Sequence, residues 1–174
     1  MSVFETERLV MRPWREDDAE NLYKYASDPA VGPAAGWPVH TSVGDSLRVL
    51  REVLIEDKTW AVTIKPSDEP VGSIGAFPTD ASGADGEPEI GYWIGRPYWG
   101  NGYIPEAVCA LIGHCFDEGA ENVWCSHFVG NDKSRRVIEK CGFRYVMTQP
   151  WQPTPEDTRD ALYYKITRKE WEHD

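Results

Sequence analysis

Several features that assign a chain to a familiar class are absent from these 174 residues. No apolar run approaches the ~20 residues that a membrane-spanning helix needs. The opening sequence MSVFETERLVMRPW carries charges where an export signal needs an apolar run. The sequence therefore predicts a cytoplasmic protein without a membrane partner.

Metal-binding and nucleic-acid-binding patterns are missing as well. The four cysteines contain no CxxC pair, so we expect reduced, buried thiols and no metal site. Lys and Arg number 18 against 29 Asp and Glu, a net charge of −11. A nucleic-acid binder needs a basic face, so we expect no nucleic-acid partner. An acidic chain suits a cationic substrate, although acidic surfaces also serve solubility.

The nucleotide-binding motifs are incomplete. There is no GxxxxGK[ST], which excludes a P-loop. Gly100 and Gly102 begin a GxGxxG pattern, but Pro105 stands where its third glycine belongs. The chain therefore lacks the dinucleotide-binding fingerprint.

The hydrophobic periodicity predicts a mixed α/β fold in a single domain, residues 1–174. Strands are predicted at 7–14, 59–65, 70–77, 88–95, 121–128, 143–148 and 161–167. Helices are predicted at 16–27, 42–56, 103–118 and 131–141, and loops at 28–41, 79–87 and 149–160. Asn131 is the expected N-cap of the last helix, and Gly142 is expected to end it. The strand–helix–strand unit from 88 to 128 reads as a parallel crossover.

One stretch carries a chemical signal, EIGYWIGRPYWGNGYIPEAV at residues 89–108. A strand runs into a bend with Gly100 and Gly102 and then directly into a strong helix. Glycines there let a ligand approach the bare backbone, and the first N–H groups of a helix attract an anion such as phosphate. The same glycines could also serve only to shape a turn.

The sequence resembles the GNAT N-acetyltransferases in three segments. They are the opening ETERLVMRPWREDDAENLYKYASDP, WGNGYIPEA within the stretch 89–108, and NDKSRRVIEKCGF further along the chain. The similarity is to the branch of RimJ/RimL type, which acetylates ribosomal-protein N-termini. It implies the GNAT fold, a largely antiparallel sheet of about six or seven strands flanked by about four helices. The sheet is expected to splay between strands 88–95 and 121–128.

The resemblance also implies acetyl-CoA as cofactor and assigns residues to it. Strand residues beside the pantetheine arm would be Tyr92, Trp93, Ile94 and Gly95. Residues around the pyrophosphate would be Trp99, Gly100, Asn101, Gly102, Tyr103 and Ile104. Asn131 would hydrogen-bond the pantetheine, Ser134 would lie near the sulfur, and Arg136 belongs to a basic island at 131–145 that suits the phosphates. Pro97 occupies a place where the family often has Gln or Arg.

Acetyl transfer to an amine needs a base, an oxyanion donor and an acid. Glu89 is the first candidate for the base and His127 the second, because both are expected beside the acetyl site. Ser134 matches the family position of the acid. A backbone N–H from Trp93 to Gly95 is the expected oxyanion donor. Glu89, His127 and Ser134 could each have a purely structural role instead, and for His127 that is the more frequent one.

The hypothesis is direct transfer in a ternary complex without an acyl-enzyme. Cys125 and Cys141 are the cysteines that could act as nucleophiles instead. No activating histidine pairs with either in the sequence pattern.

Two features bear on the acceptor. Residues 65–91 hold six carboxylates and one lysine, which predicts an acidic rim attractive to a cationic amine. Trp37, Trp60 and Trp93 could wall an acceptor tunnel. Three functions stay open: acetylation of a protein or peptide N-terminal amine, acetylation of a small amine (antibiotic, polyamine or amino acid), and non-catalytic acyl-CoA binding. A homodimer is an expectation at the level of the family.

Overall fold

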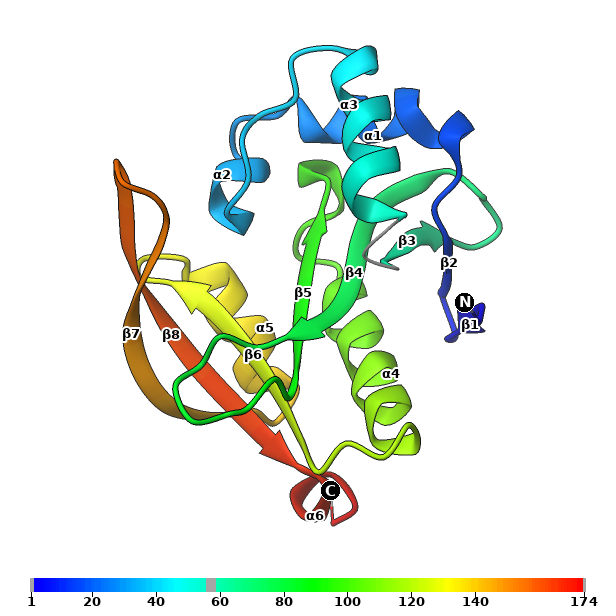
Figure 1. Ribbon diagram of the computed structural model, residues 1–174. Helices are drawn as coiled ribbons and strands as arrows, with labels where there is room; N and C mark the ends of the chain where they lie inside the picture. The colour runs from blue at the N-terminus through cyan, green and yellow to red at the C-terminus, as the bar shows by residue number, and fades with distance from the viewer. Residues whose placement is uncertain (1, 56–58, 174) are drawn as a thin grey trace. The chain divides into compact units, whose positions relative to one another are not determined.

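The computed structural model describes residues 2–55 and 59–173. Within these residues the strands are β1 (Phe4–Glu5), β2 (Leu9–Pro13), β3 (Trp60–Ile64), β4 (Pro70–Pro78), β5 (Pro88–Ile94), β6 (Asn122–Phe128), β7 (Arg144–Thr154) and β8 (Asp157–Thr167). The helices are α1 (Ala19–Ala26), α2 (Gly32–Ala35), α3 (Val43–Val49), α4 (Tyr103–Asp117), α5 (Asp132–Lys140) and α6 (Arg168–Trp171) (Figure 1). Short 3-10 turns occupy Glu16–Asp18 and Arg96–Tyr98, and α3 continues as a π-helical segment, Leu50–Leu54.

The strands form a mixed sheet in the order β1-β2-β3-β4-β5-β6-β8-β7. The fold is therefore the predicted mixed α/β fold, with eight strands in the described residues where about six or seven were expected. β5 and β6 are parallel and have α4 between them in sequence, as predicted. Their register joins Glu89 to Trp124 and Ile90 to Cys125.

The chain divides into two compact units. Unit 1 comprises Met1–Gly75 and Tyr92–Ala110, and unit 2 comprises Ala76–Gly91 and Leu111–Asp174. The prediction of one domain over residues 1–174 stays a prediction, and its first and last residues lie outside the described part of the chain. No helix among residues 2–55 and 59–173 has the length and apolarity to cross a bilayer.

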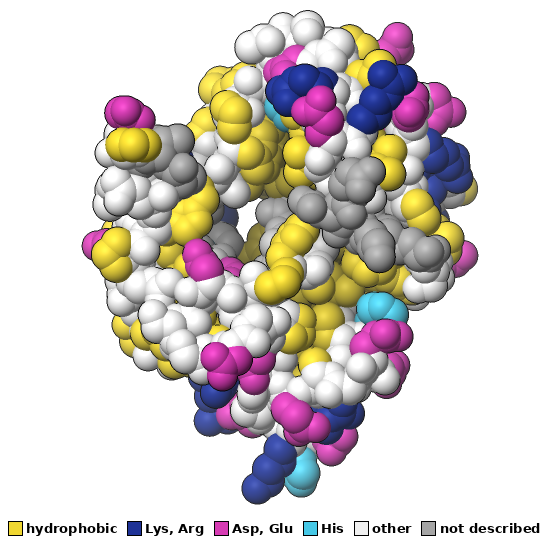
Figure 2. Space-filling view, in the orientation of Figure 1, with side chains coloured by type: hydrophobic (Ala, Val, Ile, Leu, Met, Phe, Trp, Pro, Cys, Tyr) yellow, Lys and Arg dark blue, Asp and Glu magenta, His cyan; other side chains and the backbone are white. Residues whose placement is uncertain are grey.

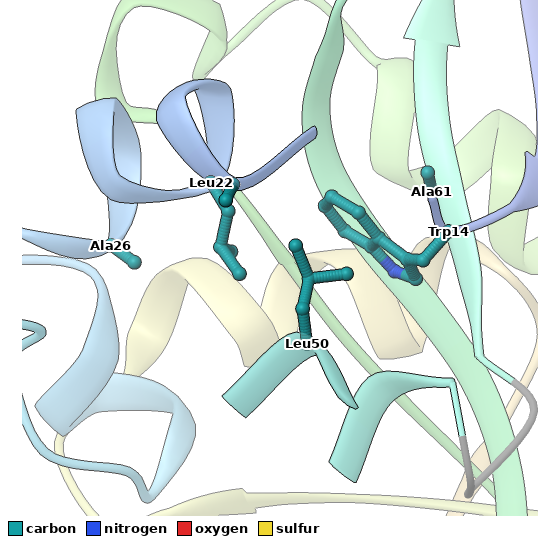
Figure 3. Packing of buried hydrophobic residues seen from close by; sticks show 6 residues of the cluster. Trp14, Leu22, Ala26, Leu50 and Ala61 are labelled. Carbon is teal, nitrogen blue, oxygen red and sulfur yellow. The ribbon is translucent and has the colours of Figure 1, made fainter. Parts of the chain in front are cut away.

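Unit 1 has its own hydrophobic core. Leu22 and Ala26 of α1 pack together with Trp14, Leu50 and Ala61 (Figure 3). The alternation in β2 explains why Leu9 and Met11 are fully buried on one face. Beside this core, the buried Arg12 forms a bidentate pair with Asp18 at 2.8 and 2.9 Å.

Unit 2 contains the largest correction to the predicted elements. The loop predicted at 149–160 is instead the end of a hairpin, in which β7 and β8 pair from Arg144↔Lys165 to Thr154↔Asp157. The prolines suggested a loop, but β7 is an edge strand. Proline is tolerated there because an edge strand leaves some N–H groups unpaired.

The other differences are at helix ends and short elements. The predicted loop 28–41 contains the short helix α2, and β1 and α6 were not predicted. The predicted end of the second helix, residue 56, lies outside the described residues. Both predicted ends of α5 are confirmed, because Asn131 accepts from the Ser134 N–H and Gly142 follows the helix with a φ of 86°.

Gly72 on β4 offers a direct test of how tightly unit 1 is built. A Cβ at this position would meet the Trp93 carbonyl oxygen and lie 3.0 Å from Ile94 Cα, both backbone atoms of β5. We expect Gly72→Ala to lower the free energy of unfolding by about 1–3 kcal/mol. Gly44→Ala is the matched control, because Gly44 lies in α3 and the atom nearest to an added Cβ would be the Ser42 Oγ at 3.7 Å. This variant should raise the free energy of unfolding by about 0.5–1 kcal/mol. Urea denaturation of both variants measures the difference, and equal effects would contradict the close approach of β4 and β5.

Candidate active site

The bend that joins β5 to α4 in unit 1 has the backbone geometry expected of an anion site. Gly100 and Gly102 have φ angles of 78° and 77°, in the left-handed region that glycine adopts without strain. A Cβ at Gly100 would meet nothing within 4 Å, so open space faces this part of the bend. α4 begins directly afterwards at Tyr103, and its first N–H groups carry the positive end of the helix dipole.

Side chains hold the bend in this shape from within. The Asn101 amide donates to the carbonyls of Tyr98 and Trp99 at 3.0 and 3.1 Å. The Trp99 indole donates to the Ile94 carbonyl at 2.9 Å. The bend is therefore fixed to its own flanking residues.

Arg8 ties the bend to the first turn of α4, and sequence reasoning missed this residue. Its guanidinium donates to the Asn101 carbonyl at 2.9 Å, pairs with Glu106 at 2.7 Å, and lies 4.7 Å from the centre of the Tyr103 ring. The Arg8 backbone N–H and the Thr6 hydroxyl also donate to Glu106. Burial would raise the pKa of Glu106, but these hydrogen bonds and the Arg8 charge outweigh it and lower the pKa. In the sequence, Arg8 stood out only as part of the opening segment ETERL, residues 5–9.

The predicted pantetheine strand, Tyr92 to Gly95, leads into this bend within unit 1. Tyr92 and Trp93 are half-buried, Ile94 is buried, and Gly95 is covered by the Tyr25 ring, which lies 2.5 Å from where a Cβ would be. The Gly95 N–H donates to the Val71 carbonyl at 2.8 Å. Of the backbone donors expected for an oxyanion, the one at Gly95 is therefore engaged in the sheet.

Glu89 lies in unit 2 and is held by two hydroxyl groups. Ser126 donates to one carboxylate oxygen at 2.5 Å and Thr79 to the other at 2.6 Å. Burial raises the pKa of Glu89, and the negative charge of Asp80 adds to it, while the two hydroxyl groups act in the opposite direction. A carboxylate with a raised pKa binds a proton more readily than an ordinary one, which favours it as a general base.

The remaining predicted residues of unit 2 lie on β6 and α5. His127 is buried, with one ring nitrogen 2.8 Å from the Phe128 carbonyl and the other 3.1 Å from the Tyr164 hydroxyl. Both its nitrogens therefore have protein partners. Asn131 uses its side-chain oxygen as the cap of α5. Ser134 lies in the first turn of α5, half-buried, and Arg136 is exposed further along it.

The cysteines are free thiols, as expected, and three of the four are buried. Burial raises the pKa of Cys125, whose thiol donates to the Ile90 carbonyl at 3.2 Å. Burial likewise raises the pKa of Cys115 to about 11. These thiols stay protonated at neutral pH, which disfavours them as nucleophiles. Among the described residues, no cluster of His, Cys, Asp or Glu could hold a metal ion.

The carboxylates expected to form an acidic rim are mostly engaged within the protein. In unit 1, Asp68 pairs with Arg12 and Arg15, and Glu69 pairs with Lys24. In unit 2, hydrogen bonds from Asn122 and Trp124 reach Glu87, and one from Tyr163 reaches Asp80. These partners reduce the attraction that the carboxylates exert on a cationic acceptor.

Two of the three tryptophans predicted for an acceptor tunnel do line a common cavity. The Trp37 and Trp93 rings meet edge to face at 5.6 Å in unit 1 and border a cavity of about 230 Å³. Trp60 is elsewhere, because its indole donates to the Ser2 carbonyl and its ring packs against Phe4.

Comparison with known proteins gives one family match that covers most of the chain. The model of the acetyltransferase (GNAT) domain matches residues 8–144. The chain is 33% identical to the N-acetyltransferase p20 of Bacillus licheniformis, itself uncharacterised, over 121 residues that make up 67% of each chain. It is 37% identical to YdaF of Bacillus subtilis strain 168, provisionally named a ribosomal N-acetyltransferase, over 86 residues covering 48% of this chain and 47% of YdaF.

A solved structure shows that the fold is shared over nearly the whole chain. The microcin C7 self-immunity acetyltransferase MccE, solved in complex with acetyl-CoA and AMP, superposes with a TM-score of 0.74. The match covers 93% of each chain at 19% identity. At 19% identity, this similarity is evidence for the fold alone.

The raised pKa of Glu89 predicts how its replacement alters stability with pH. A group whose pKa is raised by folding adds stability below its unfolded pKa, and this contribution is lost as the pH rises through the folded pKa. We therefore expect the unfolding free energy of Glu89→Gln, relative to the wild type, to increase as the pH rises above the ordinary glutamate value of 4.5. Urea denaturation at a series of pH values measures this difference.

Glu20→Gln is the control for this series, because it removes a carboxylate that is exposed on α1. A flat or falling difference for Glu89→Gln across the same pH range would contradict the raised pKa.

Proposed function

Because the chain belongs to the GNAT acetyltransferase family, we propose that it transfers the acetyl group of acetyl-CoA to the N-terminal amine of a protein or peptide. Acyltransfer from acetyl-CoA is the chemistry of the family. The peptide acceptor is the further step, and its support is the similarity to YdaF and to the RimJ/RimL branch.

The observation that carries the proposal is the bend at 99–103. Its two left-handed glycines, the open space at Gly100 and the first turn of α4 fit a diphosphate group. Acetyl-CoA, when bound, supplies an acetyl thioester. We assign its pyrophosphate to the residues from Trp99 to Ile104, and its pantetheine arm to Tyr92–Gly95 together with Asn131. Arg136 on α5 is assigned to its phosphates.

The chain's own groups have separate tasks in the transfer. An ammonium has no lone pair, so the acceptor must lose a proton before it attacks. We assign this proton to Glu89, directly or through a water, because its pKa is raised and its two oxygens are held by hydroxyl groups. His127 is the second candidate. Ser134 is assigned to donate a proton to the departing thiolate.

The alternative acceptor is a small amine. The microcin C7 self-immunity acetyltransferase MccE shares this fold, and one fold can serve enzymes with different substrates. A screen of thiol release with acetyl-CoA against peptides and small amines, followed by mass spectrometry of the products, separates these acceptors. Binding of acetyl-CoA without thiol release for any amine would point to a non-catalytic module.

Gly100→Ala tests the assignment of the bend. Its Cβ would project into open space, so the protein should fold, with a backbone cost of about 1–2 kcal/mol. The methyl group would obstruct a diphosphate at the bend, and we expect the affinity for coenzyme A to fall about tenfold or more. Gly119→Ala is the matched control, because Gly119 also has a left-handed φ of 98° and open space, but follows the other end of α4. Calorimetric titration should give Gly119→Ala the wild-type affinity for coenzyme A. An equal loss of affinity in both variants would show that the bend does not bind coenzyme A.

Glu89→Gln tests the base. We expect kcat to fall by about 10²–10⁴ and the acidic limb of the pH profile to disappear, since the ionised carboxylate is the active form. His127→Gln should keep the profile of the wild type. If Glu89→Gln turns over normally and His127→Gln does not, His127 is the base.

A further inference from the structure

The cavity of unit 1 that Trp37 and Trp93 border is the feature from which we infer the acceptor's chemistry. It has a volume of about 230 Å³ and is lined mainly by apolar side chains. They are Leu22 of α1, Val49 of α3, Val53 and Leu54 of the π-helical segment, and Trp37 and Trp93. Val53 is 41% exposed, so the cavity reaches the surface. Figure 2 shows hydrophobic side chains on the surface beside α3, next to charged side chains of both signs.

We propose that this cavity receives an uncharged apolar side group, preferably aromatic, of the amine that the enzyme acetylates. The proposal rests on the proposed function and specifies its acceptor. A pocket that encloses a whole small molecule usually has about 300–1,000 Å³. The smaller volume here suits one side group, with the amine itself outside.

The charge of the lining favours an apolar occupant. Asp45 and Arg48 pair at 2.8 Å, so the charges at the cavity's edge compensate one another. His40 is buried, its Nδ1 lies 2.8 Å from the Ser46 hydroxyl, and burial lowers its pKa, which keeps it neutral at pH 7. A charged side group would lose its hydration in the cavity without gaining an unpaired opposite charge.

The wall of the cavity is held in place before any ligand binds. The Trp37 ring lies so close to Gly32 of α2 that a Cβ there would be 2.6 Å from it. The Trp37 N–H donates to the Gly32 carbonyl at 3.1 Å, and the His40 N–H donates to the Ala26 carbonyl of α1 at 3.1 Å. A preformed aromatic wall binds a matching group with little loss of entropy.

Trp93 connects this cavity to the reaction. Its side chain lines the cavity, while its backbone belongs to the strand Tyr92–Gly95 that we assigned to the acetyl donor. A side group that packs against the Trp93 ring would place the rest of its molecule, including the amine, near the strand Tyr92–Gly95. This placement makes the occupant a part of the acceptor.

The experiment measures kcat/KM for peptides X-Ala-Ala-Ala at saturating acetyl-CoA, with X as Phe, Leu, Gly or Lys, and for phenethylamine against ethylamine. We expect Phe and Leu to exceed Gly and Lys by about tenfold or more. Equal use of Gly and Phe, or a preference for Lys, would overturn the proposal. The peptide and small-amine arms distinguish the source of the apolar group.

Variants then locate the preference. Val49→Phe should fill the cavity and lower kcat/KM for the Phe peptide about tenfold, leaving the Gly peptide within about twofold. Val53→Phe, at the exposed edge of the cavity, should also lower kcat/KM for the Phe peptide. It tests the same point if Val49→Phe fails to fold. Val43→Phe is the control, because Val43 is on α3 but 39% exposed and outside the lining. A uniform loss for every peptide would contradict the assignment.

Direct binding separates this inference from the proposed function. Calorimetry with phenylalaninamide in the presence of coenzyme A should detect binding to the wild type that Val49→Phe abolishes and Val43→Phe retains. If no amine is acetylated but this pattern holds, the proposed function is wrong and the cavity assignment stands. If amines are acetylated and phenylalaninamide binds equally to all three proteins, the cavity assignment is wrong.

Discussion

The fixed bend between β5 and α4 is the constraint on which the proposed function of this chain depends. Two left-handed glycines expose backbone there, but exposed backbone binds an anion well only if it does not have to be ordered first. Arg8 supplies that order, because one guanidinium contacts Asn101, Tyr103 and Glu106 together. Glu106 would otherwise place a negative charge in the first turn of α4, close to where a phosphate would bind. Its pairing with Arg8 compensates that charge and fixes the bend at the same time.

The net charge of −11 has less bearing on the acceptor than its size suggests. Asp68 and Glu69 pair with cations, and Glu87 accepts two hydrogen bonds from fixed N–H donors. Paired and hydrogen-bonded carboxylates attract a distant cation weakly, because local partners and salt screen them. The shape and apolarity of the cavity beside Trp93 are therefore the basis of the specificity that we propose.

The sequence predicted the elements whose signals are local. The caps at Asn131 and Gly142 and the glycines of the bend depend on neighbouring residues, and the structure has them as expected. The β7–β8 hairpin was missed because its prolines favour a loop. They are compatible with a strand only at the edge of a sheet, and the sequence does not show that β7 lies there. Arg8 was missed because its partner Glu106 is 98 residues away. Trp60 was misplaced for the same reason, since spacing alone does not say which tryptophans converge.

Glu89 shows how burial can serve chemistry at a cost in stability. Desolvation raises its pKa and so increases its affinity for a proton, but the same desolvation penalises the ionised form that must accept the proton. The hydroxyls of Thr79 and Ser126 moderate this conflict, because each donates to one carboxylate oxygen without adding a positive charge. A lysine or arginine in their place would stabilise the carboxylate further and lower its pKa, which would weaken the base. Neutral donors therefore orient the carboxylate while leaving its affinity for a proton high.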